Sequence, residues 1–306
     1  MSQGRRFNAM LGIYDTETDQ LTDRDNFVID ALKSSFIDPK VEVIKPQIIF
    51  SIREKGAMQF NLKRVFTLGN FSAIIGKAKS KKTYLLSAIC AAILSGRLMW
   101  DKFHGEKQDD KTTLLYFDTE QSDYDSWNVV RRIVLMAGKI DGFRAYNLRR
   151  FTPKERRDII NFAMDIYGKE SGFVVIDGVA DLVNSINSEE EASEVSTMLL
   201  RLTKDYNCHI CNVIHQNKGD GYATGHIGSY IMKKCEVIIR LTKDENNSSE
   251  SRVECDMIRG TSDFNPFTLR INPDGIPEID NVVIDVDNKF KVIDESCFEI
   301  RKDEPF

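Results

Sequence analysis

Four short, continuous apolar runs constrain the fold of this chain more than any other feature of its sequence. Stretches with helical signals alternate with these runs, and continuous rather than alternating apolar residues are typical of strands buried on both faces. The runs span residues 72–76, 112–120, 172–178 and 209–216. The pattern predicts an α/β fold with a mainly parallel sheet flanked by helices.

The segments that separate these runs carry clear helix signals. A proline begins the third segment and a glycine ends it, and three glutamates open the fourth, where the helix dipole favours negative charge. The sequence predicts helices over residues 82–98, 123–138, 153–168 and 188–206.

The pattern changes after Gly228. Two β-prone runs, 235–243 and 252–260, flank a polar turn and predict a C-terminal antiparallel hairpin, to which residues 267–271 add a strand.

Three regions follow from this organisation. We expect residues 1–40 to form an N-terminal helical extension around one amphipathic stretch, 24–36, residues 41–275 to form the main domain, and residues 276–306 to form an acidic C-terminal tail.

The segment between the first run and its helix resembles a phosphate-binding loop. Gly76 lies six residues before Lys82, as that motif requires, and Thr83 follows the lysine, but Lys81 occupies the place of the usual second glycine. In such a loop, backbone N–H groups surround a phosphate, the lysine reaches its oxygens, and the hydroxyl ligates Mg²⁺. The candidate nucleotide-binding residues are Gly76, Lys77, Ala78, Lys79, Ser80, Lys81, Lys82 and Thr83. The alternative is a solvated lysine-rich loop that binds no nucleotide.

Carboxylates follow two of the other runs. Asp177 comes directly after four apolar residues, and Glu120 ends the run 112–120. Because ligands of such sheets bind at the carboxyl ends of the strands, we expect both side chains near the phosphate loop. Taken singly, each could instead be a capping or turn residue.

The segments GKAKSKKT, YFDTE, VVIDG and VIHQNKG occur in an order that resembles the RecA-like ATPases. Within that group, the resemblance is to the hexameric DnaB and RepA replicative helicases and to related ATPases of plasmids and mobilisable elements. It covers roughly residues 45–272. The resemblance implies a RecA-like P-loop core that binds ATP and Mg²⁺ and hydrolyses ATP.

The resemblance also implies roles for individual residues. Lys82 would bind the β- and γ-phosphates, and Asp177 would support the Mg²⁺ ion that Thr83 ligates. Glu120 would polarise the attacking water, and Gln216, with a histidine beside it, would sense the γ-phosphate.

Two further parts of the chain match functional segments of the family. Arg259 resembles the arginine finger that these proteins insert into a neighbour's site, although Met257 stands where the helicases often have a lysine. Residues 217–234 correspond to the segment that binds single-stranded DNA in a ring channel, with a flexible surface loop as the alternative. In this segment Lys218, His226, Lys233 and Lys234 could reach phosphates, and Tyr222 could stack on a base. The other candidate channel loop, 184–193, is acidic and would repel phosphate.

Composition limits the partners. The net charge is −5 over 306 residues, so nucleic acid would be contacted only locally, in a groove or a ring channel.

The longest apolar segment, 84–95, is too short to span a bilayer, and the first residues contain no apolar run of a signal peptide. Cys208 and Cys211 have the spacing of a metal knuckle but lie in an apolar run, where buried thiols are the better interpretation. We therefore expect a cytoplasmic protein with reduced cysteines and no membrane partner.

These observations predict a Mg²⁺-dependent ATPase, a DNA-associated motor or helicase in replication or transfer of a plasmid or mobile element. It would act as a homo-oligomer, with a hexameric ring implied by the resemblance. The alternative is a nucleotide-binding regulator or scaffold with weak ATP turnover, which the lysine at position 81 permits.

Overall fold

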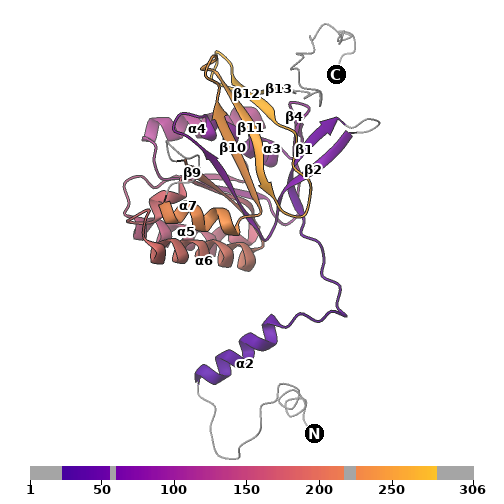
Figure 1. Cartoon of the computed structure of the whole chain (residues 1–306), viewed down its shortest axis with the longest axis vertical. Coiled ribbons are helices and arrows are strands. Elements are labelled where there is room, and N and C mark those ends of the chain that lie inside the picture. The colour runs from indigo at the N-terminus through magenta and orange to yellow at the C-terminus, as the bar shows by residue number, and fades with distance from the viewer. Residues whose placement is uncertain (1–22, 56–59, 217–224, 281–306) are drawn as a thin grey trace, which may run out of the picture. The chain divides into compact units, whose positions relative to one another are not determined.

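The computed structural model describes residues 23–55, 60–216 and 225–280 (Figure 1). The chain divides into two units, residues 1–45 and 46–306. In the first unit, helix α2 (Asp23–Ser35) occupies the amphipathic stretch where a helix was expected, and none of its residues is buried.

Among the described residues, nine strands form the main sheet in the order β13-β12-β11-β10-β3-β9-β8-β6-β7. The strands are β3 (Phe71–Gly76), β6 (Thr113–Asp118), β7 (Phe143–Asn147), β8 (Ser171–Asp177), β9 (His209–His215), β10 (Val237–Lys243), β11 (Glu250–Ile258), β12 (Phe267–Ile271) and β13 (Pro277–Asp280). Strands β10, β3, β9, β8, β6 and β7 run parallel, whereas β11, β12 and β13 are antiparallel additions. The predicted mainly parallel sheet with a C-terminal antiparallel hairpin is confirmed.

Two separate cores cover the two faces of this sheet, as the continuous apolar strands require. Along β3, Ile74 belongs to one core while Ala73 and Ile75 belong to the other. Helices α3 (Lys82–Ser95) and α4 (Asp123–Ala137) pack on the first face. The second face is covered by α5 (Pro153–Tyr167), α6 (Glu189–Tyr206) and α7 (Gly225–Lys234). A parallel strand in this position therefore has no solvent face on which to carry polar residues.

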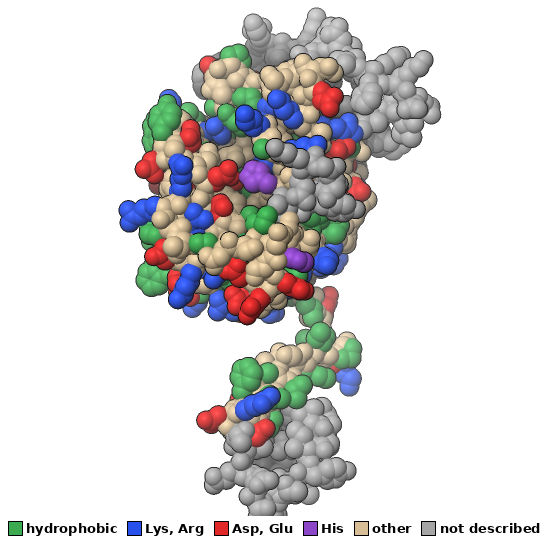
Figure 2. Space-filling view, turned by 60° about the vertical axis from the view of Figure 1, so that its left-hand side comes forward, with side chains coloured by type: hydrophobic (Ala, Val, Ile, Leu, Met, Phe, Trp, Pro, Cys, Tyr) green, Lys and Arg blue, Asp and Glu red, His purple; other side chains and the backbone are tan. Residues whose placement is uncertain are grey.

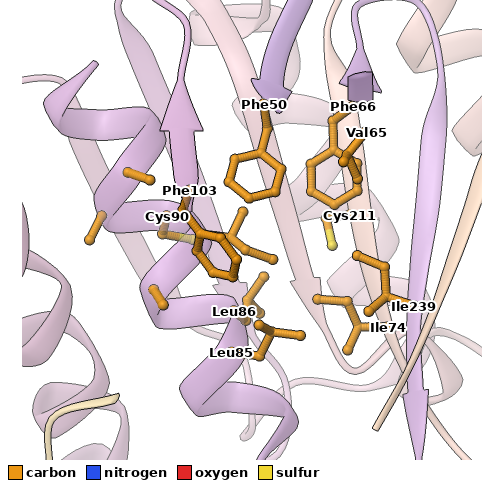
Figure 3. Close-up of a cluster of buried hydrophobic side chains, with 14 of the residues drawn as sticks. Phe50, Val65, Phe66, Ile74, Leu85, Leu86, Cys90, Phe103, Cys211 and Ile239 are labelled. Atoms are coloured by element: carbon orange, nitrogen blue, oxygen red, sulfur yellow. The ribbon is translucent and has the colours of Figure 1, made fainter. Parts of the chain in front are cut away.

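A small second sheet, which the sequence did not predict, extends the first core. Its described strands are β1 (Ile48–Lys55), β2 (Phe60–Thr67), β4 (Leu98–Met99) and β5 (Phe103–Gly105), in the order β2-β1-β5-β4. Phe50 packs against Phe66 and Phe103, with ring centroids 5.4 and 5.2 Å apart, over Leu86 of α3 (Figure 3).

The expected helices and strands lie within about three residues of their predicted bounds, because local capping chemistry ends them. Thr152 and Glu155 form a capping box around Pro153 at the start of α5, and Ser188 accepts a hydrogen bond from the Glu191 N–H at the start of α6. The sequence missed β7, β13 and α7. Residues 277–280, which we assigned to the tail, pair with β12 as β13.

Within the described ranges, no helix combines the length and the apolar character that a membrane crossing requires. Cys208 and Cys211 are buried free thiols.

His209 is the most strongly buried titratable group that joins the two sheets. Its Nδ1 donates to the Thr67 carbonyl (2.8 Å) and its Nε2 accepts from the Ser72 hydroxyl (2.9 Å), while its ring stacks 4.5 Å from that of Phe66. Burial lowers the pKa of His209 to about 3. Between about pH 3 and pH 6.5 the imidazole is therefore neutral in the folded protein, whereas the unfolded chain protonates it.

The His209 pKa predicts an acid sensitivity of the fold. Since the unfolded histidine binds a proton below about pH 6.5, the free energy of unfolding should fall as the pH drops from there toward 3, by about 1.4 kcal/mol per pH unit from this group. Urea unfolding of His209→Gln between pH 7 and pH 4.5 should lack that part of the slope. The exposed His226→Gln is the matched control, and an equal loss of slope there would refute the assignment.

Candidate nucleotide site

The loop between β3 and α3 has the backbone path of a phosphate-binding loop. A Cβ at Gly76 would lie 2.5 Å from the Ser80 hydroxyl and 2.6 Å from the Leu241 carbonyl, so only glycine fits at the end of β3. The Ser80 N–H donates to the Lys77 carbonyl and closes the turn.

Lys81 adopts the left-handed conformation that the missing glycine would take without strain. Its φ is 66° and its ψ is 28°, at the residue that caps α3. A lysine in this conformation costs roughly 1–2 kcal/mol. Its side chain turns away from the loop interior, and its Nζ donates to the Glu250 carbonyl (3.1 Å) and to the Ser251 hydroxyl (3.4 Å) of β11. The substitution therefore preserves the loop and redirects one side chain to the hairpin.

Lys82 occupies the centre of the loop. Its Nζ donates to the carbonyls of Gly76 (2.9 Å) and Lys77 (3.1 Å), and it lies 3.2 Å from Nδ1 of His215. Burial lowers the pKa of this ammonium, and the nearby carboxylates of Asp177 and Glu120 oppose that shift.

Asp177 ends β8 directly beside the helix that follows the loop. Its Oδ2 accepts hydrogen bonds from the Thr83 hydroxyl (3.2 Å) and the Tyr116 hydroxyl (2.8 Å). Burial raises the pKa of Asp177 to about 6, against the effect of both hydrogen bonds. Because burial disfavours its negative charge, a bound cation next to Asp177 would stabilise the ionised carboxylate.

His215 connects Lys82 to Glu120. Its Nε2 lies 3.2 Å from Oε2 of Glu120, while its Nδ1 faces the Lys82 ammonium. An ammonium only donates and a carboxylate only accepts, so both contacts are satisfied when the proton sits on Nε2. The hydrogen bond from His215 is the main reason that the pKa of Glu120 is lowered, although the carboxyl remains largely exposed.

Asp118 orders the turn that carries Glu120. Its carboxylate accepts from the backbone N–H groups of Glu120 (3.1 Å) and Gln121 (3.0 Å) and from the Ser126 hydroxyl (2.7 Å) of α4. Four donors in all, counting the Gln121 side chain, converge on this buried carboxylate, and they fix the direction in which Glu120 leaves the strand.

One cavity of about 650 Å³ is lined by Lys82, Thr83, Glu120, Asp177 and His215. Lys82, Thr83, Asp177 and Glu120 come together there as expected from the sequence. Of Gln216, the structure shows a backbone N–H that donates to the Gly76 carbonyl (3.1 Å). The side chain that lines the cavity is that of its neighbour His215.

Arg259 lies away from this cavity. Ile258 pairs with Val237, and Val237 pairs with Ser72 near the amino end of β3, whereas the phosphate loop follows the carboxyl end. The Arg259 guanidinium donates to the Lys233 carbonyl (2.9 Å). The arginine cannot reach the site of its own subunit from there.

The two candidate channel segments lie side by side where the structure describes them. The Ile227 N–H donates to the Ile186 carbonyl (3.3 Å), and a Cβ at Gly225, whose φ is +70°, would lie 2.4 Å from that oxygen. Lys234, expected to reach phosphates, instead donates to the Ser196 hydroxyl (2.8 Å). Lys218 and Tyr222, also expected there, lie outside the described residues.

Two features of the site were missed from the sequence. Alternation along β6 could have placed Tyr116 on the same face as Asp118, but nothing local indicates that it meets Asp177. The turn Asp274, Gly275 and Ile276 also lines the cavity, and only the pairing of β12 with β13 brings it there.

The residues present fit a Mg²⁺ ion that is shared with a nucleotide. The described part of the chain contains no cluster of three or more His, Cys, Asp or Glu side chains that could hold a metal alone. Thr83 and Asp177 supply two oxygens at one point, and Mg²⁺ is commonly held by one or two carboxylates together with substrate phosphates.

A phosphate loop and two strand-end carboxylates on a parallel sheet place this protein in the class of RecA-like P-loop ATPases. A family model described as an AAA domain matches residues 48–221, more than half of the 306-residue chain, so the chain belongs to that family.

A solved structure supports the fold. The crystal structure of the RadB recombinase is similar, with a TM-score of 0.51 and 19% sequence identity, over 70% of this chain and 92% of the RadB chain. At this identity the match shows a shared fold alone. No curated protein matches the sequence.

The Tyr116–Asp177 hydrogen bond predicts a pH-dependent cost of removing the hydroxyl. Tyr116→Phe should lower the free energy of unfolding by about 1–3 kcal/mol at pH 7.5, because it leaves a buried carboxylate short of a donor. The cost should shrink at pH 5, where Asp177 is protonated, and in an Asp177→Asn background. An identical cost in all three urea titrations would show that the hydroxyl does not act on Asp177.

Proposed function

We propose that this protein is a Mg²⁺-dependent ATP hydrolase. The observation that carries the proposal is the chain of contacts from Lys82 through His215 to Glu120. It joins a phosphate-binding group to a carboxylate able to act on water, within one cavity. A loop that only bound phosphate would not need the second half of this arrangement.

Each residue has a role that follows from its chemistry. Lys82 and the N–H groups of residues 76–83 bind the phosphates, and Thr83 and Asp177 hold Mg²⁺. When bound there, the ion would neutralise charge on the phosphate oxygens. Glu120, kept ionised by its lowered pKa, orients and polarises the attacking water.

His215 reports phosphate occupancy to Glu120, with Gln216 retained as a second candidate sensor. The Lys82 ammonium has three donors, and its three neighbours here are the Gly76 carbonyl, the Lys77 carbonyl and His215. A bound phosphate must therefore replace at least one of them. Loss of the contact between Lys82 and His215 would change the environment of the imidazole and thereby its hydrogen bond to Glu120.

We further propose that the protein is a DNA-associated motor of the RepA/DnaB type, in replication or transfer of a plasmid or mobile element. The position of Arg259 supports an oligomer, such as a hexameric ring, because the arginine could serve only a neighbour's site. The contact between Ile227 and Ile186 supports a shared channel surface for single-stranded DNA that includes residues 217–234.

The charge distribution suits local rather than broad contact with DNA. Acidic and basic side chains are interspersed on the face in Figure 2. In the acidic segment 184–193, the Glu191 carboxylate turns back to accept from the N–H groups of Asn184 and Ser185, so its oxygens are bonded within the loop while its charge remains.

ATP turnover and binding of three proteins, with and without single-stranded DNA, test the proposal. Lys82→Ala should weaken ATP binding by about tenfold or more, because it removes a charge-assisted hydrogen bond. Glu120→Gln should retain ATP binding and lose about 10²-fold or more in turnover. The wild type should turn over ATP several-fold faster with DNA.

The outcomes separate the alternatives. If Lys82→Ala bound ATP as tightly as the wild type, the assignment of this cavity as the nucleotide site would be refuted. Tight binding without turnover in the wild type would favour a nucleotide-binding regulator or scaffold. If single-stranded DNA left the rate of ATP turnover unchanged, the ATPase activity would stand but the proposed role as a DNA motor would be refuted.

The His215 contact predicts a shift in the pH profile of turnover. In His215→Ala the pKa of Glu120 should rise, since its main hydrogen bond is lost, and the acid limb of the turnover profile should move to higher pH. His215→Gln keeps an N–H donor and should restore the limb toward its wild-type position. Coincident acid limbs in all three proteins would show that His215 does not hold Glu120.

A further inference from the structure

Two chemically different sets of residues line the candidate nucleotide cavity. Glu120, Asp177 and His215 supply groups suited to phosphate chemistry. Tyr84, Arg132 and the turn of Asp274, Gly275 and Ile276 also line the cavity. A nucleoside triphosphate with its terminal phosphate beside the first set leaves the second set for its nucleoside. The Arg132 guanidinium already lies 3.9 Å over the Tyr84 ring, which gives this region planar surfaces.

The turn that forms part of this wall is internally well ordered. The Asn272 N–H donates to the Ile276 carbonyl (3.0 Å), and the Asn272 side chain accepts from the N–H groups of Asp274 (3.1 Å) and Ile276 (2.9 Å). Its position over the cavity therefore depends on the strands that carry it, β12 and β13.

Strands β12 and β13 are connected to the phosphate loop through the part of the β10–β11 hairpin that extends past the end of β3. We call this part, residues 242–252, the overhang. Gly76, the last residue of β3, pairs with Leu241, so the main sheet supports β10 only to that point. Beyond it, Lys243 pairs with Ser251, and Glu250 and Ser251 pair with Arg270 and Leu269 of β12. This end of the hairpin lies past the end of β3, with the phosphate loop beside it.

Lys81 ties the loop to this overhang. Its Nζ donates to the Glu250 carbonyl and the Ser251 hydroxyl, and Ser251 is fully buried. On the other side of β11, the Glu250 carboxylate accepts from Nε of Arg270 (2.9 Å). The Lys81 ammonium thus connects the phosphate loop to Glu250. Glu250 in turn bonds Arg270, which lies just before the turn between β12 and β13.

The backbone gains nothing from a lysine here. Glycine adopts a φ near +66° without strain, whereas lysine costs roughly 1–2 kcal/mol in that conformation. The side chain must therefore supply any advantage of Lys81, and both of its hydrogen bonds go to β11.

We propose that Lys81 is a positioning residue that ties the β10–β11 overhang, and with it the Asp274–Ile276 wall, to the phosphate loop. It thereby sets the affinity of the cavity for the nucleoside part of its ligand and leaves phosphate binding to Lys82. This inference rests on the proposed function, because it takes a nucleoside triphosphate as the ligand.

Binding of Mg·ATP and of inorganic tripolyphosphate with Mg²⁺ separates the two parts of the ligand. Lys81→Gly should weaken ATP binding by about tenfold more than it weakens tripolyphosphate binding, since a charge-assisted hydrogen bond to the overhang is lost. Lys81→Arg keeps a cationic donor and should recover part of the loss. Lys82→Ala should weaken both ligands alike.

Lys79→Gly is the matched control for charge and backbone. Lys79 belongs to the same loop, has a φ of 64°, and has an exposed side chain. Replacing it removes the same positive charge from the same backbone conformation without touching the hairpin. We expect Lys79→Gly to leave the ratio of the ATP and tripolyphosphate dissociation constants within about twofold of the wild type.

An unchanged ratio in Lys81→Gly would overturn the positioning role while leaving the nucleotide site intact. The same holds for a ratio that rises equally in Lys79→Gly, because charge alone would then explain the effect. A wild type that binds neither ligand would overturn the proposed function, and this inference with it.

Discussion

Burial of the central strands on both faces is the constraint on which the rest of the structure depends. Two separate cores enclose β3, β9, β8 and β6, so a polar side chain within these strands would have to find its partners inside the protein. The functional groups therefore follow the strands at their carboxyl ends. Because the strands are parallel, those ends share one edge, and Lys82, Glu120, Asp177 and His215 meet there.

At that edge, a few buried hydrogen bonds determine which residues act together. The three contacts of Lys82 leave its ammonium no spare donor, so phosphate binding and the state of His215 are linked. Asp118 fixes the direction of Glu120, and Tyr116 and Thr83 hold Asp177. The site is therefore a network of hydrogen bonds, in which a change in the position or charge of one group affects the groups bonded to it.

The resemblance between short segments and a known family indicated more of the site than of its surroundings. It identified Lys82, Thr83, Asp177 and Glu120, since each lies at a fixed distance from an apolar run. It named Gln216 as the sensor with a histidine beside it, and the structure shows that this histidine, His215, contacts both Lys82 and Glu120. A motif alone does not decide which of two neighbouring residues at a strand end enters a site, because the side-chain direction alternates along the strand.

The amino-acid sequence by itself determined the α/β class, the four apolar strands at the centre of the sheet and the phosphate loop. These depend on periodicity, capping residues and spacing along the chain, which are local. Only the tertiary structure decided that Arg259 lies at the opposite edge from the loop, that Tyr116 meets Asp177, and that Lys81 reaches β11. Each of these depends on which strands become neighbours, because the partners are separated by many residues and meet only when the sheet has formed.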